Sequence, residues 1–338
     1  MWTWSRERTL SPTRPADAAA LERAAEILRA GGLVAFPTET VYGLGANALD
    51  PAAIARIYAA KGRPATNPLI VHVADVDAAR QLAASWPRAA ELLASAFWPG
   101  PLTLVVPKSA QVPDAATAGL AAVGLRVPAH PVALALLRAV GLPLAAPSAN
   151  RSTELSPVTA RHVARSIAER VDLILDGGPT SVGIESTVVD LTGARPRILR
   201  PGAIGAEAIE RVVGPLDPRP APAAARGAQL APGQSERHYA PRARLVLAAE
   251  GDGRTGVLAR ATRARGEAVG LVTFGADLGV EADVVARLPR EPRAAAARLY
   301  ATLHDLDDDG CALVVVETPP RDPAWDAVRD RLTRAATP

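Results

Sequence analysis

Small polar and charged side chains gather in four segments of the chain, each placed where an apolar run ends. The segments are Pro37–Gly45 (Pro-Thr-Glu-Thr-Val-Tyr-Gly-Leu-Gly), Lys61–Pro68, Pro147–Asn150 with the Ser156-Pro pair that follows, and Glu185–Thr187 with Arg200-Pro-Gly. In open α/β sheets, ligands bind beyond the carboxyl ends of strands, where such loops converge. We therefore expect the four segments to build one site.

Lys61 and Arg63 stand in a turn rich in proline and glycine, directly after an expected helix. Cations at a helix C-terminus complement its negative pole and can serve only as a cap. They can equally clamp a polyphosphate, the ammonium as a point charge and the guanidinium as a fork. Lys61 and Lys108 are the only lysines of an arginine-rich chain, which favours the phosphate interpretation for this turn.

Four other residues admit two interpretations from the residues alone. Arg126 interrupts an apolar run, which is costly unless the side chain faces water or an anion. Ser148 and Asn150 either cap a turn or contact a ligand. His72 lies in the apolar run 69–73 and is either a core histidine or a ligand contact.

Several familiar motifs are imitated or missing. Gly43 to Ala48 fits G-x-G-x-x-A, but the expected helix is capped by Asp50, beyond the motif, whereas a dinucleotide loop starts its helix inside it. Asp305 to Gly310 resembles the start of a calcium loop, but Val316 replaces the required carboxylate. There is no P-loop motif, and the histidines lack metal-ligand spacing. We expect no protein metal site.

Hydrophobic periodicity predicts the elements that must position these loops. We expect helices at 17–30, 51–61, 76–97, 131–140 and 158–170, and strands at 33–36, 69–73, 102–106, 124–127, 144–146, 173–175 and 186–190. Asp50-Pro51 is a typical cap and first helical residue. The mixing of strands and helices predicts a single α/β domain over residues 1–214.

The rest of the chain divides into a linker and a smaller unit. Residues 215–243 are proline-rich and aperiodic, as in an extended linker, and we interpret its more polar part, 231–241, as a lid. In residues 244–338 we expect strands at 244–249, 268–274 and 312–317, with helices at 292–305 and from 323. This pattern predicts a second, small α/β domain.

Composition bounds the class of protein. The 338 residues, 49% of them hydrophobic and 22% charged, fit a globular chain of about two domains. A formal net charge of +3 does not by itself argue for nucleic-acid binding. The single cysteine, Cys311, excludes an internal disulfide framework. Because neither an apolar run of about 18 residues nor a signal-peptide pattern is present, we expect a cytoplasmic protein.

Taken together, the four segments resemble the YrdC-like threonylcarbamoyl-AMP synthase family. Trp98-Pro-Gly-Pro-Leu-Thr and Arg126-Val-Pro-Ala-His-Pro add to the match, which runs in consistent order over residues 17–214. His-Tyr-Ala-Pro at 238–241 and the unit after it resemble the long, two-domain branch. The resemblance implies a YrdC-like twisted open mixed sheet with helices, plus a smaller C-terminal Rossmann-like α/β domain.

The resemblance also assigns residues to two substrates. Threonine would be held by Thr40, His72, Arg126, Ser186 and the backbone of Ala146. ATP would be held by Lys61, Arg63, Asn67, Ser148, Asn150, Ser156 and Arg200, with His238 and Tyr239 folding over the nucleotide. Ala122 stands at an ATP-contact position that is often polar in relatives, so only a backbone contact would survive there. Lys61 and Arg63 are the candidates for catalysis.

The implied activity is the synthesis of threonylcarbamoyl-AMP and pyrophosphate from L-threonine, bicarbonate or CO2, and ATP, for tRNA modification. Mg²⁺ would be bound mainly through the ATP phosphates, and a threonylcarbamoyl transferase complex would use the product. We expect at most a weak RNA contact and no membrane contact. Two alternatives stay open: a carbamoyl-adenylate step of the hydrogenase-maturation type, disfavoured by the single cysteine, and a double-stranded RNA-binding module, disfavoured by the low net charge.

Overall fold

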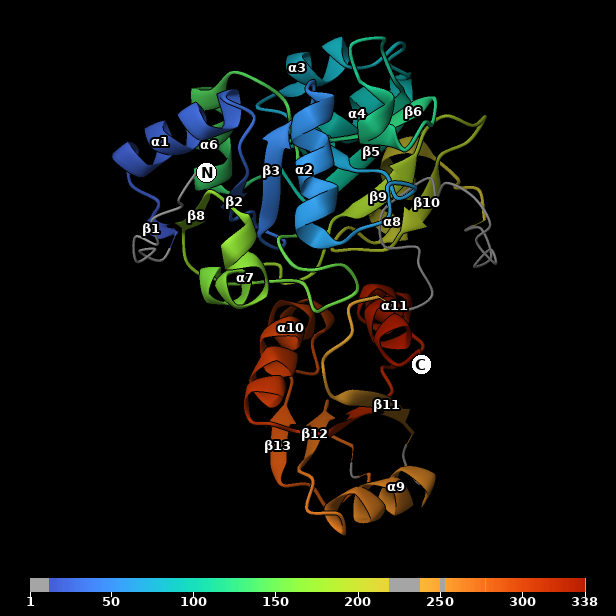
Figure 1. Cartoon of the computed structure of the whole chain (residues 1–338). Helices are drawn as coiled ribbons and strands as arrows, with labels where there is room; N and C mark the ends of the chain where they lie inside the picture. The colour runs from blue at the N-terminus through green and yellow to red at the C-terminus, as the bar shows by residue number, and fades with distance from the viewer. Residues whose placement is uncertain (1–11, 219–237, 250–252, 277, 338) are drawn as a thin grey trace, which may run out of the picture.

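Two β-sheets organise the chain, each with its own helices (Figure 1). The computed structural model describes residues 12–218, 238–249, 253–276 and 278–337. We call the ten-stranded sheet with its helices the N-terminal lobe and the four-stranded sheet with its helices the C-terminal lobe. Residues 219–237, which hold most of the expected linker and part of the expected lid, lie outside the described residues.

The large sheet is open and mixed, as the sequence predicts. Its strands run in the order β1 (Thr13–Pro15), β8 (Leu173–Asp176), β2 (Val34–Phe36), β3 (Gly43–Asn47), β7 (Leu144–Ala145), β4 (Ile70–His72), β6 (Ala122–Arg126), β5 (Leu102–Pro107), β9 (Thr187–Asp190) and β10 (Arg197–Arg200). β4 pairs with β6 in parallel, whereas β3 is antiparallel to both of its neighbours. The segment 43–48 thus enters an antiparallel strand, and no helix starts inside it, which confirms that it is not a dinucleotide loop.

Helices cover the two faces of this sheet unequally. On one face pack α2 (Pro51–Lys61), α4 (Arg88–Phe97), α5 (Asp114–Thr117), α7 (Ala160–Ile167) and α8 (Ala206–Val213). On the other face, α1 (Ala18–Arg29) and α6 (Pro131–Val140) pack on β2, β7 and β8. α2 begins at the expected cap, where the side chain of Asp50 accepts from the amide of Ala52.

Strand alternation turns several polar side chains toward the less covered face. Successive side chains of a strand point to opposite faces. Val71 and Leu125 belong to the core under the larger helix layer, so His72 and Arg126, which follow them directly, point the other way. Thr103 does the same beside Leu104. A polar site can therefore form on this face without interrupting the main core.

The N-terminal lobe corrects some boundaries. The expected helix 76–97 is two helices, α3 (Val76–Gln81) and α4, because Pro87 cannot continue a helix and instead caps the second one. The expected helix 158–170 is α7 followed by a 3₁₀ turn at Ala168–Arg170. The short strands β1, β3 and β10 and the helices α5 and α8 were not expected.

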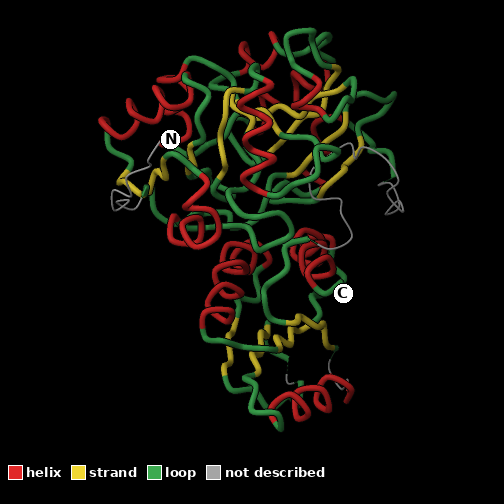
Figure 2. The backbone as a smooth tube through the Cα atoms, viewed as in Figure 1, coloured by secondary structure: helices red, strands yellow, loops and turns green. Residues whose placement is uncertain are grey.

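The C-terminal lobe is a small, fully parallel α/β unit, as predicted. Its strands run in the order β11 (Arg244–Ala248), β14 (Leu313–Glu317), β12 (Val269–Thr273) and β13 (Val284–Arg287). The helices α10 (Pro292–Asp308) and α11 (Asp326–Ala335) lie on the face toward the N-terminal lobe, and α9 (Gly253–Arg263) lies on the opposite face (Figures 1 and 2). β13 and α9 were not expected.

The two lobes share one hydrophobic core. Val41, Leu155, Val158 and Ile184 of the N-terminal lobe cluster with α10, α11 and the small sheet. At Gly183, a Cβ atom would lie 2.5 Å from the Cα of Ala297 on α10, so the loop and the helix touch backbone to backbone. Loops of the large sheet are therefore held directly by the C-terminal lobe.

In the described part of the chain, the helices are too short or too polar to span a bilayer.

Candidate active site

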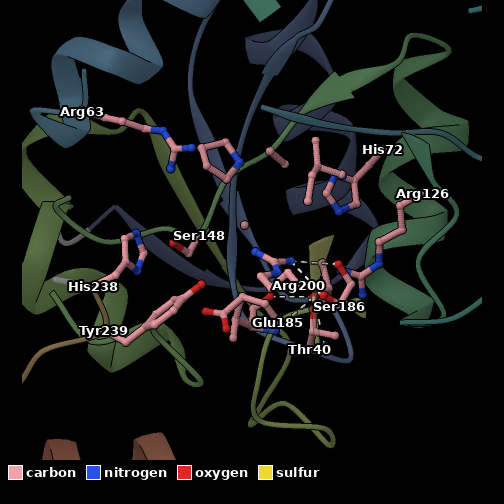
Figure 3. A pocket seen from close by; sticks show the side chains of 16 residues that line it. Thr40, Arg63, His72, Arg126, Ser148, Glu185, Ser186, Arg200, His238 and Tyr239 are labelled. Carbon is pink, nitrogen blue, oxygen red and sulfur yellow. Dashed lines mark hydrogen bonds between the residues drawn. The ribbon is translucent and has the colours of Figure 1, made fainter. Parts of the chain in front are cut away.

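A cavity opens on the less covered face of the large sheet, beside the lobe interface (Figure 3). Loops from all four sequence segments and from the end of the linker meet there. Its lining comprises Thr38, Thr40, Val41, Gly43, Arg63, Ile70, His72, Arg126, Ala146, Pro147, Ser148, Glu185, Ser186, Arg200, His238 and Tyr239. The structure thus brings together, from distant parts of the chain, most of the residues that the sequence singles out.

Arg126 occupies one end of the cavity and is held by a carboxylate. Its Nη2 donates to Oε1 of Glu39 at 2.6 Å, and its Nε donates to the carbonyl of Gly100 at 3.3 Å. The second oxygen of Glu39 accepts from the amide of Ala129 at 3.0 Å. Both charged side chains are buried, so the pair fixes the direction of the guanidinium.

His72 lies beside Arg126 with a ring nitrogen available. Only 3% of the residue is exposed, and among the described residues its Nδ1 has no hydrogen-bond partner. Burial, helped by the charge of Arg126, lowers the pKa of the imidazole to about 3. The ring is therefore neutral near pH 7 and can donate or accept a hydrogen bond within the cavity.

Ser186 and Thr40 complete this end of the cavity, next to Arg200 (Figure 3). The hydroxyls of Ser186 and Thr103 are 2.8 Å apart. Nη2 of Arg200 donates to the carbonyl of Ser186 at 2.9 Å and to its hydroxyl at 3.1 Å. Burial lowers the pKa of Arg200, as expected for a guanidinium packed inside the protein.

The opposite end of the cavity carries Arg63, Ser148, His238 and Tyr239 (Figure 3). Nη2 of Arg63 donates to the carbonyl of Pro68 at 2.9 Å, and burial lowers its pKa to about 10, so it keeps its charge at pH 7. The rings of His238 and Tyr239 lie 4.0 Å apart. Tyr239 has φ +61°, a strained conformation for a side chain of its size.

Lys61 stands behind the cavity wall and is not part of its lining. Its Nζ donates to the carbonyls of Ser148 and Asn150, both at 2.5 Å. Burial lowers the pKa of this ammonium well below its usual value. In this structure, Lys61 therefore holds the loop that bears Ser148 and does not itself face the cavity.

Four other residues expected at the ATP site also lie outside the lining. Asn67 is buried, with no described partner for its Oδ1. Asn150 donates from Nδ2 to the carbonyl of Glu154 at 2.9 Å, inside the same loop. Ser156 donates its hydroxyl to Oε1 of Glu185 at 2.5 Å. Ala122 begins β6, paired with Pro107, at the opposite end of the strand from Arg126.

Ala146 lies in the lining, where only its backbone is polar. Its amide donates to the carbonyl of Ile70 at 2.9 Å. A ligand contact from Ala146 would therefore use its carbonyl oxygen.

Sequence reasoning assigned no role to Glu185, which lines the cavity, or to its partners Tyr300 and Arg331 from the C-terminal lobe. It also assigned none to Glu39, the partner of Arg126. Glu185 is buried and contacts both lobes, since it accepts from Ser156, from Tyr300 at 3.2 Å and from Arg331 at 2.7 Å. One signal was present in the sequence: Arg331 occupies the apolar face of α11, between Val328 and Leu332. A charge at such a position needs a buried partner.

The charges of the cavity suit anionic ligands better than a protein-bound metal. Among the described residues, no group of three or more His, Cys, Asp or Glu side chains is placed to hold a metal ion. Both carboxylates near the cavity, Glu39 and Glu185, are engaged by arginines. A cation would therefore depend on oxygens that the ligand itself brings.

The fold and the site define a class: α/β proteins with a cavity on the open face of a mixed sheet, lined here by Arg63, Arg126 and Arg200. A family model described as "Telomere recombination" matches residues 26–202. A second one, described as "Threonylcarbamoyl-AMP synthase, C-terminal domain", matches residues 204–337.

Individual relatives agree with these models. The threonylcarbamoyl-AMP synthase of Pyrococcus abyssi is 44% identical over 319 residues, or 93% of each chain. That of Bacillus subtilis is 42% identical, over 94% of this chain and 92% of its own. The crystal structure of P. abyssi Sua5 complexed with L-threonine superimposes with a TM-score of 0.88, at 42% identity and 96% coverage of both chains. The chain belongs to the two-domain threonylcarbamoyl-AMP synthase family.

Proposed function

We propose that this protein synthesises threonylcarbamoyl-AMP and pyrophosphate from L-threonine, bicarbonate or CO2, and ATP. The observation that carries the proposal is the chemical division of a single cavity. One end presents Arg126 among neutral polar groups, and the other presents Arg63 beside two aromatic rings (Figure 3). An amino acid and a nucleotide bound at these ends would meet near Arg200.

The threonine end suits a small zwitterion. Arg126, oriented by Glu39, is matched to the carboxylate of an amino acid. Thr40, Ser186, neutral His72 and the carbonyl of Ala146 offer short-range hydrogen bonds to the ammonium and hydroxyl groups of threonine. These roles are proposals that rest on the lining and on the family.

The nucleotide end suits a polyphosphate and a base. Arg63 and Arg200 supply positive charge, and His238 and Tyr239 supply ring faces. Lys61 would act on ATP indirectly, because its ammonium holds the loop of Ser148 and Asn150 in place. We propose that Asn67 and Ser156 orient the side chains and the loop that contact ATP. Any contact between Ala122 and ATP would be made by the backbone of Ala122.

The chemistry needs alignment rather than an enzyme nucleophile. The amine of threonine takes up CO2 to give a carbamate, and a carbamate oxygen attacks the α-phosphorus of ATP, expelling pyrophosphate. The residues of the cavity bring two anionic reactants together and neutralise charge that develops on the phosphates. Mg²⁺, bound mainly through the phosphates, would supply further neutralisation when present.

We further propose three functional parts: a catalytic domain of residues 1–214, a linker and lid of 215–243, and a second domain of 244–338. In support, α8 ends at Val213 and β11 begins at Arg244. Ala240 donates its amide to the carbonyl of Thr153 at 2.9 Å, which fastens the end of the linker to the site. A threonylcarbamoyl transferase would receive the product, with at most weak contact to RNA.

Pyrophosphate release from ATP by the purified protein tests the proposed function. We expect release that requires both L-threonine and bicarbonate, because the carbamate is the nucleophile. L-Serine and L-valine, each lacking one group of threonine, serve as matched controls and should support slower release. Release of the same rate without threonine would contradict the proposal.

A further inference from the structure

Glu185 places a negative charge in the wall of the cavity, between its two ends (Figure 3). Its Oε1 accepts from the hydroxyl of Ser156 at 2.5 Å, and the side chain is 8% exposed. A buried carboxylate is costly unless it is compensated. It would also repel the triphosphate of ATP, since charges interact strongly where water is excluded. The site therefore needs a cation for Glu185.

The C-terminal lobe supplies that cation. Nε of Arg331, on α11, donates to Oε2 of Glu185 at 2.7 Å, and its side chain is 1% exposed. Tyr300, on α10, donates its hydroxyl to the same oxygen at 3.2 Å. Burial alone would raise the pKa of Glu185, but Arg331 and then Arg200 outweigh burial and hold it below its usual value. The carboxylate is therefore ionised and paired.

Arg331 also reaches the residues that close the cavity. The centre of its guanidinium lies 5.0 Å from the centroid of the Tyr239 ring, within the range of a cation–π contact. Among the described residues, its buried Nη2 has no hydrogen-bond partner. One side chain of the last helix thus contacts both Glu185 and the aromatic wall of the nucleotide end.

We propose that Arg331 is a positioning residue of the synthase reaction. It neutralises Glu185, so that this carboxylate can fix Ser156 beside the triphosphate without opposing ATP binding. The inference rests on the proposed function and gives the C-terminal lobe a task in it. The lobe completes the electrostatics of a site whose substrate-facing residues come mostly from the other lobe.

The Arg331→Met variant removes the charge and keeps the length of the side chain. We expect the KM for ATP to rise at least tenfold, because Glu185 is left uncompensated near the phosphates. The KM for threonine should change less than threefold, since Arg126 and His72 are untouched. Arg329→Met, a partly exposed arginine on the same helix, is the matched control and should stay within twofold of wild type.

A second substitution, Glu185→Gln, distinguishes a role of Arg331 in ATP binding from a role in protein stability alone. In a Glu185→Gln background the carboxylate beside the triphosphate is gone, and Arg331 keeps only its pair with Asp330, at 2.8 Å from Nη1. Adding Arg331→Met should therefore raise the KM for ATP less than threefold. This cycle isolates the coupling between the two residues. An equal penalty in both backgrounds, or an equal rise in both KM values, would overturn the proposal.

Direct binding keeps the test independent of the reaction. ATP affinity is measured by calorimetric titration of wild type and all variants, after thermal unfolding shows which of them are folded. Loss of affinity in Arg331→Met that is restored in the double variant supports the proposal. If Arg331→Met does not fold, the double variant provides the test. An ATP affinity of the double variant close to that of Glu185→Gln supports the proposal. A folded double variant that does not bind ATP overturns the proposal. Threonine-independent pyrophosphate release by wild type would instead count against the proposed function.

Discussion

At the scale of single residues, the site is marked by polar atoms that are buried but unused. Among the described residues, Oδ1 of Asn67, Nδ1 of His72, Nδ1 of His238 and Nη2 of Arg331 are buried without a hydrogen-bond partner. Buried polar groups are normally paired. His72 and His238 belong to the lining of the cavity, so their ring nitrogens are placed to pair with a polar ligand, whereas the unpaired buried hydroxyls of Ser109 and Thr180 are not part of that lining.

His72 should make stability depend on pH. Its pKa is about 3 in the folded protein and about 6.5 in an unfolded chain. The unfolded state thus binds more protons between these values, and stability falls as pH drops from about 6.5 toward 3. Replacing His72 with glutamine should reduce the loss of unfolding free energy between pH 7 and pH 5 by about 2 kcal/mol.

Urea unfolding of wild type and His72→Gln at the two pH values measures this difference. His162 and His238 also have pKa values lowered to about 3, mainly by burial, so the variant should keep part of the pH dependence. Equal losses of unfolding free energy between pH 7 and pH 5 in the two proteins would mean that folding does not lower the pKa of His72.

Residue types and spacing predicted the lining of the cavity better than the interactions that support it. Arg126 was recognisable because a charge in an apolar strand must face water or an anion, but the sequence did not decide between the two, and its partner Glu39 lies 87 positions away. Lys61 was expected to face ATP, and only the folded chain shows that it bonds to the loop behind. The sequence held no local signal that joins Glu185 to Arg331, because the contact exists only once the lobes have docked.

At the scale of elements, the contact between the loop at Gly183 and α10 fixes the cavity wall. Gly183 has φ +75°, and a Cβ there would lie 2.5 Å from Cα of Ala297 and 2.6 Å from the carbonyl oxygen of Ala296. Glu185 follows two residues later. The close approach of α10 thus decides where that carboxylate stands.

Gly183→Ala should destabilise the protein by about 2–4 kcal/mol, because the substitution combines a strained backbone with overpacking. It should also lower the affinity for ATP. Gly193→Ala is the control: its Cβ would meet only the carbonyl of Arg195 at 3.7 Å, and we expect a change within about 0.5 kcal/mol. Chemical unfolding of the two variants gives the comparison, and similar costs would show that α10 can yield at this contact.

Strongly periodic elements were predictable, and short or edge elements were not. The cap of α2 is visible in the sequence as Asp50-Pro51, and α6 spans the expected residues, Pro131–Val140. β3, in contrast, is rich in glycine and has weak strand propensity. It forms because β2 and β7 pair with it on both sides. Such tertiary pairing leaves little trace in local sequence.

At the scale of the whole molecule, one hydrophobic cluster spans both lobes. Val41 and Ile184 from one lobe pack in the same cluster as Leu299 and Leu332 from the other. Separating the lobes would expose this apolar surface, at about 25 cal/mol per Å². We therefore expect a single thermal unfolding transition in scanning calorimetry. Two transitions well apart would show that the lobes unfold independently.

The two lysines give the molecule an unusual chemical surface. Lys61 is 3% exposed and bonded to two carbonyls, and Lys108 pairs with Asp114. Reagents that acylate side-chain amines therefore find few targets, because the other basic residues are arginines. Such reagents do not modify arginine under the same conditions. Any acylation of Lys61 would report that the loop from Ser148 to Asn150 had opened, so a labelling experiment reads the motion of the nucleotide end directly.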